Sequence, residues 1–262
     1  MADDAASFPP PTGASGTTPA PAGLSRNVVT ELVGTLVLML AGPGLIVLSN
    51  GQASDLAVAL SFGAGLAVAI GVIGAVANPA FTLALLVVRE ISIRDAVGDW
   101  IGQIAGGILG AAVVWGINDQ TRSSLGANGW DRSGFRELGS VMAAELVFTI
   151  IVVVVLLSSI SQGLSKASIA AFTGLAYAIG HLVLGGIDGG GMNPARSLGS
   201  AIFSDNDPNA LGQVWVFIVV PLVAAVAAVF VWLMIDDAEI DDTIFDDTFV
   251  DDLQNAATGD TD

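Results

Sequence analysis

The sequence predicts an all-α membrane protein with six transmembrane helices and two half-helices, arranged as an inverted repeat. The chain of 262 residues is 53% hydrophobic and only 13% charged, with a mean hydropathy of +0.75, which is typical of a protein that crosses a membrane several times. Six apolar stretches approach the length of about 20 residues that spans a bilayer. The tripeptide Asn-Pro-Ala also occurs once in each half, beginning at Asn78 and at Asn193.

Composition divides the chain into a membrane domain and two tails. Residues 1–26 are rich in Pro, Ala, Gly, Ser and Thr and lack the basic and apolar regions of a signal peptide, which favours a disordered N-terminal tail. Residues 27–235 form the membrane domain, and residues 236–262 form an acidic C-terminal tail. The first repeat, 27–117, contains spans at about 27–48, 53–74 and 96–117, and the second repeat, 138–235, contains spans at about 138–158, 168–186 and 214–235.

The two Asn-Pro-Ala tripeptides predict two short helices. Asn caps free backbone donors, and Pro at the first helical position loses no hydrogen bond, so Asn78-Pro79-Ala80 and Asn193-Pro194-Ala195 each open a helix. The apolar residues that follow end near Val88 and Phe203, too early to cross a bilayer. Non-helical backbone at that depth requires protein or a wet cavity around it. We therefore expect two half-helices beside a water-filled path.

The register of the two halves supports an inverted repeat. Glu31 precedes Asn78 by 47 residues, and Glu145 precedes Asn193 by 48. Each half holds three full spans, an odd number, so the second half enters the membrane from the opposite side. This arrangement places the special site near the midplane, where the half-helices meet.

Charge and cysteine content exclude several classes of function. Eight basic and 25 acidic residues give a formal net charge of −17, which excludes a nucleic-acid binder. Eleven of the acids lie in the tail from Asp236 to Asp262, and such a surface suggests a halophilic source. The sequence has no Cys and one His, so disulfides, thiolate metal sites and His-rich metal sites are excluded.

The residues at the predicted centre favour neutral molecules. Two facing half-helix N-termini, each worth about half an elementary charge, make the midplane positive. Asn78 and Asn193 could each donate to a passing water, which would break a continuous chain of protons. Arg196 lies one helical turn after Asn193, and an Arg within an apolar region is a functional hypothesis by default.

Two Asn-Pro-Ala motifs, the second extended by Arg196-Ser197, on a six-span inverted repeat resemble the aquaporin, or major intrinsic protein, family. The resemblance covers about residues 27–235 and implies an aquaporin-like channel domain. It also implies a narrow selectivity filter. Arg196 matches the family's filter arginine, His181 the histidine of water-selective members, and Gly190 the loop position that lends a carbonyl. The aromatic filter position on the second span matches Phe62, whereas ungapped counting from Asn78 selects Val58.

Glu31 and Glu145 have two interpretations. They could be carboxylates of an ion or proton pathway. They also resemble the family's buried glutamates that bind the loop backbone leading into each half-helix, where unpaired donors would be costly. Their symmetric positions favour this structural role.

We interpret the chain as a passive water channel that excludes protons and ions, with no catalysis, metal or cofactor. The alternative is an aquaglyceroporin that passes glycerol or other small neutral solutes. A secondary transporter, coupled through Glu31 and Glu145, and a non-conducting scaffold, with the tail as its partner surface, are the remaining rivals. The resemblance further implies a homotetramer in the plasma membrane, and the four-to-three bias of basic residues leans toward cytoplasmic termini.

Overall fold

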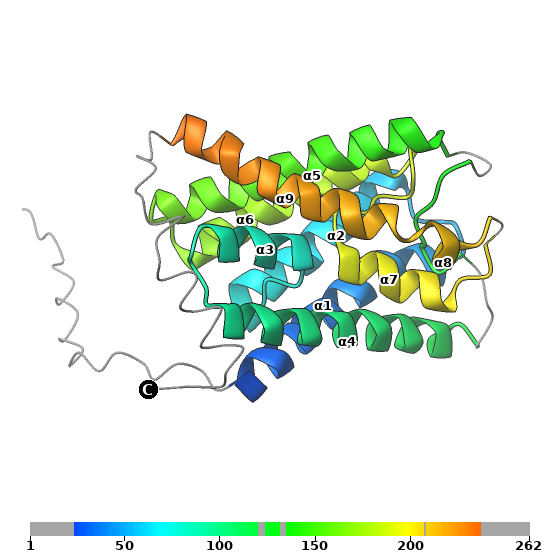
Figure 1. Cartoon of the computed structure of the whole chain (residues 1–262). Helices are drawn as coiled ribbons and strands as arrows, with labels where there is room; N and C mark the ends of the chain where they lie inside the picture. Colours follow the sequence, from blue (N-terminus) through cyan, green and yellow to red (C-terminus); the bar gives the residue numbers. More distant parts are fainter. Residues whose placement is uncertain (1–23, 120–123, 132–134, 207, 237–262) are drawn as a thin grey trace, which may run out of the picture.

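The computed structural model describes residues 24–119, 124–131, 135–206 and 208–236, and all regular structure in these ranges is helical. Figure 1 shows the helices side by side with the short α3 and α7 between the long ones. The helices are α1 (Leu24–Leu48), α2 (Asp55–Val68), the π-helical turn η1 (Ala69–Ile73), α3 (Pro79–Val87), α4 (Ile93–Ile117), α5 (Leu138–Ser161), α6 (Lys166–Leu184), α7 (Pro194–Phe203), α8 (Ala210–Gln213) and α9 (Val216–Ile235).

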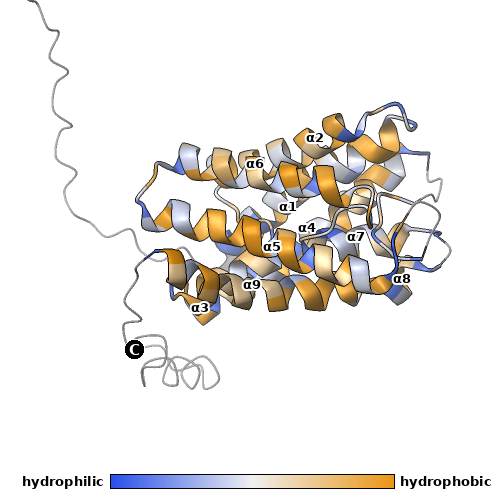
Figure 2. Ribbon diagram, turned by 90° about the horizontal axis from the view of Figure 1, so that it is seen from above, coloured by the Kyte–Doolittle hydropathy of each residue, from blue (hydrophilic) through white to orange (hydrophobic). Residues whose placement is uncertain are grey.

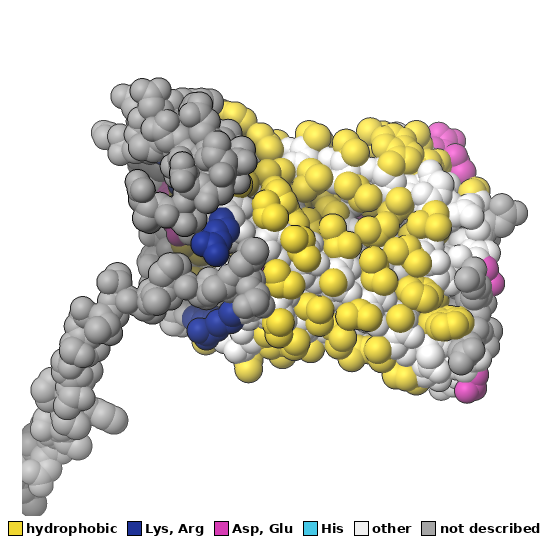
Figure 3. Space-filling view, turned by 60° about the horizontal axis from the view of Figure 1, so that its bottom comes forward, with side chains coloured by type: hydrophobic (Ala, Val, Ile, Leu, Met, Phe, Trp, Pro, Cys, Tyr) yellow, Lys and Arg dark blue, Asp and Glu magenta, His cyan; other side chains and the backbone are white. Residues whose placement is uncertain are grey.

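Six helical segments of the described chain are long and apolar enough to cross a membrane. Their sides are largely hydrophobic in Figure 2, and the hydrophilic colours gather toward the ends. On the face seen in Figure 3, hydrophobic side chains cover the middle, with Lys and Arg at one end and Asp and Glu at the other. Large apolar side chains such as Val72 and Phe230 are exposed along the sides, as lipid contact requires.

The half-helices form as the sequence predicts, because each begins at its asparagine. Asn78 has an extended backbone, and its side chain accepts a bond from Ala80 N at 3.0 Å. Asn193 also has an extended backbone, and its side chain accepts a bond from Ala195 N at 3.1 Å. Helices of nine and ten residues rise about 15 Å, half of a hydrocarbon core of about 30 Å. The predicted fold class, six spans and two half-helices in an inverted repeat, is confirmed.

Glycine lets the helices approach until their backbones touch. A Cβ added to Gly63 of α2 would fall on the carbonyl oxygen of Gly174 of α6, and one on Gly174 would lie 2.6 Å from the Gly63 oxygen. A Cβ on Gly107 of α4 would fall on the Ala195 oxygen, and one on Gly199 of α7 on the Gly107 oxygen. Small residues at such crossings allow the van der Waals contact that drives helix association in lipid.

Several boundaries differ from the predicted ones. The second span ends in the π turn η1 at Ile73, which leaves only residues 74–77 between it and Asn78. The fourth span runs to Ser161 instead of about 158, and the short helix α8 precedes the last span. The two tails fall almost entirely outside the described residues, so their predicted disorder and acidic role stay predictions.

Candidate functional site

The N-termini of α3 and α7 meet at the centre of the fold through a reciprocal pair of hydrogen bonds. Asn78 Nδ2 donates to the Met192 carbonyl at 2.9 Å, and Asn193 Nδ2 donates to the Ala77 carbonyl at 2.7 Å. Both asparagines are fully buried. An amide nitrogen carries two N–H donors, so each Asn keeps a second donor beyond the one that joins the two loops.

Glu31 of α1 holds the loop that leads into α3. Its two oxygens accept bonds from Val76 N at 2.6 Å and Ala77 N at 2.8 Å. Gln103 of α4 donates to the same carboxylate at 2.9 Å and to Thr82 Oγ1 at 2.8 Å, so it also ties α3 to α4. The loop amides therefore point away from the centre.

Glu145 of α5 repeats this contact in the second half. Its oxygens accept bonds from Gly191 N and Met192 N, both at 2.7 Å, and the carboxylate is fully buried. With their N–H groups bound to Glu145, the trans peptides of this loop direct their carbonyls to the opposite side. One of these carbonyls, that of Gly191, accepts from the Tyr177 hydroxyl at 3.4 Å.

Replacing Glu145 with alanine should strongly destabilise the protein. Two buried backbone donors would lose their acceptor, at about 1–3 kcal/mol each. Glu145→Gln keeps one acceptor oxygen and should lose about half as much. Thermal unfolding in detergent checks both variants. Unfolding of Glu145→Ala at the wild-type temperature would contradict this role for the carboxylate.

Three of the predicted filter residues come together from three helices. The rings of Phe62 of α2 and His181 of α6 are stacked, with centroids 3.7 Å apart and planes inclined by 21°. The guanidinium carbon of Arg196 lies 5.1 Å from the Phe62 centroid. His181 Nδ1 is 3.1 Å from the Tyr177 carbonyl, and because a carbonyl only accepts, Nδ1 carries the proton.

Gly190, the fourth predicted residue, packs directly against His181. A Cβ on Gly190 would lie 2.8 Å from His181 Cδ2, and the backbone φ of Gly190 is +70°. Both the space and the left-handed backbone therefore favour glycine here. The alternative to Phe62, Val58, does not stack on His181 but lines the cavity outside it.

Asn128 was missed by the sequence analysis, although it holds Arg196 in place. Its Oδ1 accepts from Arg196 Nη1 at 2.5 Å and from Ser197 Oγ at 2.7 Å. Arg196 Nη2 donates to the Gly189 carbonyl at 3.3 Å, while Nε has no partner among the described residues. Asn128 lies in the polar connection between the halves, where sequence spacing gives no signal.

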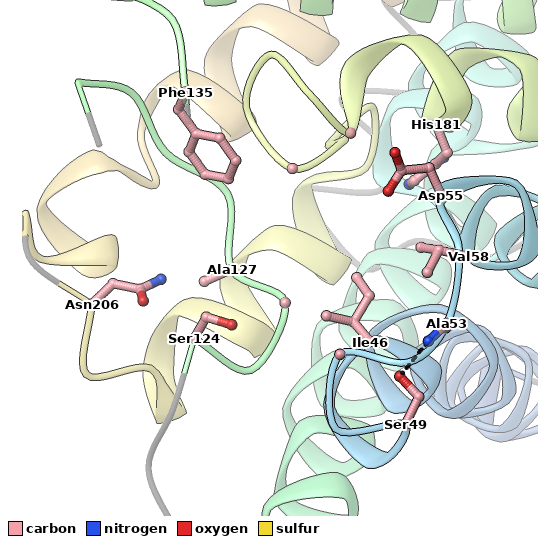
Figure 4. A pocket seen from close by; sticks show the side chains of 14 residues that line it. Ile46, Ser49, Ala53, Asp55, Val58, Ser124, Ala127, Phe135, His181 and Asn206 are labelled. Atoms are coloured by element: carbon pink, nitrogen blue, oxygen red, sulfur yellow. Dashed lines mark hydrogen bonds between the residues drawn. The ribbon is translucent and has the colours of Figure 1, made fainter. Parts of the chain in front are cut away.

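A cavity of about 500 Å³ opens outside the stacked rings, and His181 lines it. Figure 4 shows Asp55 and Val58 on one side, with Phe135, Ala127 and Asn206 across from them. The connection between the halves therefore forms one wall of the cavity. The described residues contain no group of three or more His, Cys, Asp or Glu placed to hold a metal ion.

Known proteins have sequences similar to this chain over most of its length. The family model described as major intrinsic protein matches residues 20–232. Glycerol uptake facilitator protein-like 6 of Lactiplantibacillus plantarum is 34% identical over 212 residues, which cover 78% of this chain and 95% of that protein. Aquaporin Z of Brucella melitensis is 34% identical over 223 residues, which cover 79% and 96%.

A solved structure agrees with the fold. The X-ray structure of the aquaglyceroporin from Plasmodium falciparum superimposes with a TM-score of 0.71 at 21% identity. The match covers 81% of this chain and 97% of that one.

Proposed function

We propose that this chain, which belongs to the major intrinsic protein family of membrane channels, passes water along its centre and excludes protons and other ions. The observation that carries the proposal is the meeting of Phe62, His181 and Arg196. Arg196 and Phe62 are fully buried and His181 is 4% exposed, so little room for a solute lies between them. Such a constriction favours the smallest neutral permeant, which is water.

The reciprocal Asn pair supports proton exclusion. The two half-helix N-termini each place about half a positive charge at the centre. Each Asn uses one amide N–H to join the loops, which leaves a second N–H that can donate to a passing molecule. A water that accepts two such bonds cannot also accept a proton from its neighbour. Outside this point, Arg196 adds a full positive charge and an Nε donor that no described residue accepts.

Glycerol is the second candidate permeant, and Gly190 is the observation that favours it. Without a side chain, this position contributes only backbone to the filter. One similar protein is named a glycerol uptake facilitator protein-like, and the solved structure is an aquaglyceroporin. The rival of a coupled transporter has less support, because Glu31 and Glu145 already bind two backbone amides each.

Stopped-flow shrinkage of proteoliposomes tests the proposal. Vesicles carrying the protein should shrink several-fold faster than bare lipid under an impermeant osmolyte, and should show little reswelling in glycerol. The response should not depend on an imposed ion gradient. Shrinkage no faster than bare lipid would contradict a channel, and rapid glycerol reswelling would identify the aquaglyceroporin instead. Running both assays in low and molar salt also tests the expected halophilic origin.

The same proposal includes the setting of the channel. We place it in the plasma membrane as a homotetramer with one pore per subunit. The four-to-three bias of basic residues supports cytoplasmic termini, because basic residues favour the cytoplasmic side.

A further inference from the structure

We propose that Asp188 is a positioning residue for the filter, holding the peptide between Gly189 and Gly190 so that the Gly189 carbonyl faces Arg196. This inference rests on the proposed function. Asp188 would then be an additional residue of the predicted filter, and it would act on the permeant only through Arg196.

The contacts form a chain from Asp188 to Arg196. Asp188 is fully buried in the loop between α6 and α7, and its Oδ1 accepts from Gly190 N at 2.7 Å. In a trans peptide the N–H and the preceding carbonyl point in opposite directions. The carbonyl of that same peptide, Gly189 O, accepts from Arg196 Nη2 at 3.3 Å. Fixing the amide therefore also fixes the carbonyl that Arg196 uses.

The loop needs such an anchor because it has few side chains of its own. Gly189 and Gly190 have φ values of +89° and +70°, and Gly191 follows them. Glycine has no Cβ to restrict its backbone, so these peptides would rotate easily without a hydrogen bond to hold them. Glu145 holds the next two amides, and Asp188 holds the one before them.

The first repeat solves the same problem without an acid. Ala75 precedes Asn78 by three residues, as Gly190 precedes Asn193, and Ala75 N donates to the Ala69 carbonyl at 3.0 Å. A neutral backbone acceptor from the π turn is therefore sufficient there. Among the described residues, the amide three positions before the asparagine therefore binds a carboxylate in the second repeat, where the carbonyl of the anchored peptide contacts Arg196, and a backbone carbonyl in the first.

The charge of Asp188 can be separated from its role as an acceptor. Glu145 of α5 and Arg196 of α7 are the charged groups that act on it. Burial, and then the neighbouring Glu145 carboxylate, raise the pKa of Asp188 well above its usual range. Asparagine at position 188 would keep the acceptor oxygen without adding charge.

The test compares Asp188→Ala with Asp188→Asn in proteoliposomes. Glycerol and water permeabilities are measured on the same vesicles, so an inactive fraction cancels from their ratio. We expect Asp188→Ala to raise the glycerol-to-water ratio about tenfold, equivalent to about 1.4 kcal/mol in relative barrier, and Asp188→Asn to stay within about twofold of wild type. An unchanged ratio in Asp188→Ala, or equal changes in both variants, would overturn the proposal.

A second measurement requires neither a substituted protein nor a permeability assay. Hydrogen exchange on the wild-type protein should show the Gly190 amide protected as strongly as those of Gly191 and Met192. Rapid exchange at Gly190 alone would refute the anchoring by Asp188. Failure of the wild-type protein to conduct water would instead count against the proposed function, which keeps the two failures distinct.

Discussion

Replacing Arg196 with valine should open the channel to cations. The guanidinium is a fully buried permanent charge next to Phe62, and two carboxyl groups, Glu145 and Asp188, act on it. At about 4 Å and an effective dielectric constant of about 20, a unit charge repels a cation by about 4 kcal/mol. At about 1.4 kcal/mol per tenfold change, its loss could raise cation flux up to about a thousandfold. The half-helix N-termini remain, so the measured increase should be smaller than this limit.

Ion flux in this variant can be measured in planar bilayers or with vesicles that contain a pH-sensitive dye. Arg196→Lys is the matched control, because it keeps the charge and loses only the planar donor fork. We expect the lysine variant to exclude cations nearly as well as wild type. If Arg196→Val conducts water normally and still excludes cations and protons, the exclusion does not depend on this charge.

Replacing Gly107 with alanine should destabilise the whole fold. The new methyl group would fall on the carbonyl oxygen of Ala195, so α7 would have to move away from α4. Overpacking of this kind costs about 1–3 kcal/mol, and more when backbone must shift, against a typical total stability of about 5–15 kcal/mol. Because α7 also carries Arg196, the surviving protein should be less selective. Leucine at position 107 should prevent recovery of a monodisperse protein.

Gly116 provides the control on the same helix. A Cβ there would meet nothing within 4 Å, so Gly116→Ala should be neutral or stabilise the helix by about 0.5–1 kcal/mol. Size-exclusion chromatography and thermal unfolding in detergent compare the two alanine variants. Equal stability of Gly107→Ala and Gly116→Ala would show that the α4–α7 contact can relax without cost.

The sequence by itself determined the spans and the two half-helices, because these follow from local rules. Apolar length decides whether a segment can cross a membrane, and Asn followed by Pro sets where a helix begins. The symmetric positions of Glu31 and Glu145 resemble the family's buried glutamates, and this resemblance predicted that each binds the loop leading into a half-helix. Family membership followed from the same motifs.

Only the tertiary structure decided which side chains gather around Arg196. Phe62 and Val58 lie on the same helix four residues apart, and which of them approaches Arg196 depends on the loop of residues 74–77, whose path the sequence does not specify. Asn128 reaches Arg196 from a connecting segment 68 residues away, and Asp188 binds Gly190 two residues along an irregular loop. Such contacts join residues far apart in the chain or in irregular loops, and helical periodicity carries no information about either.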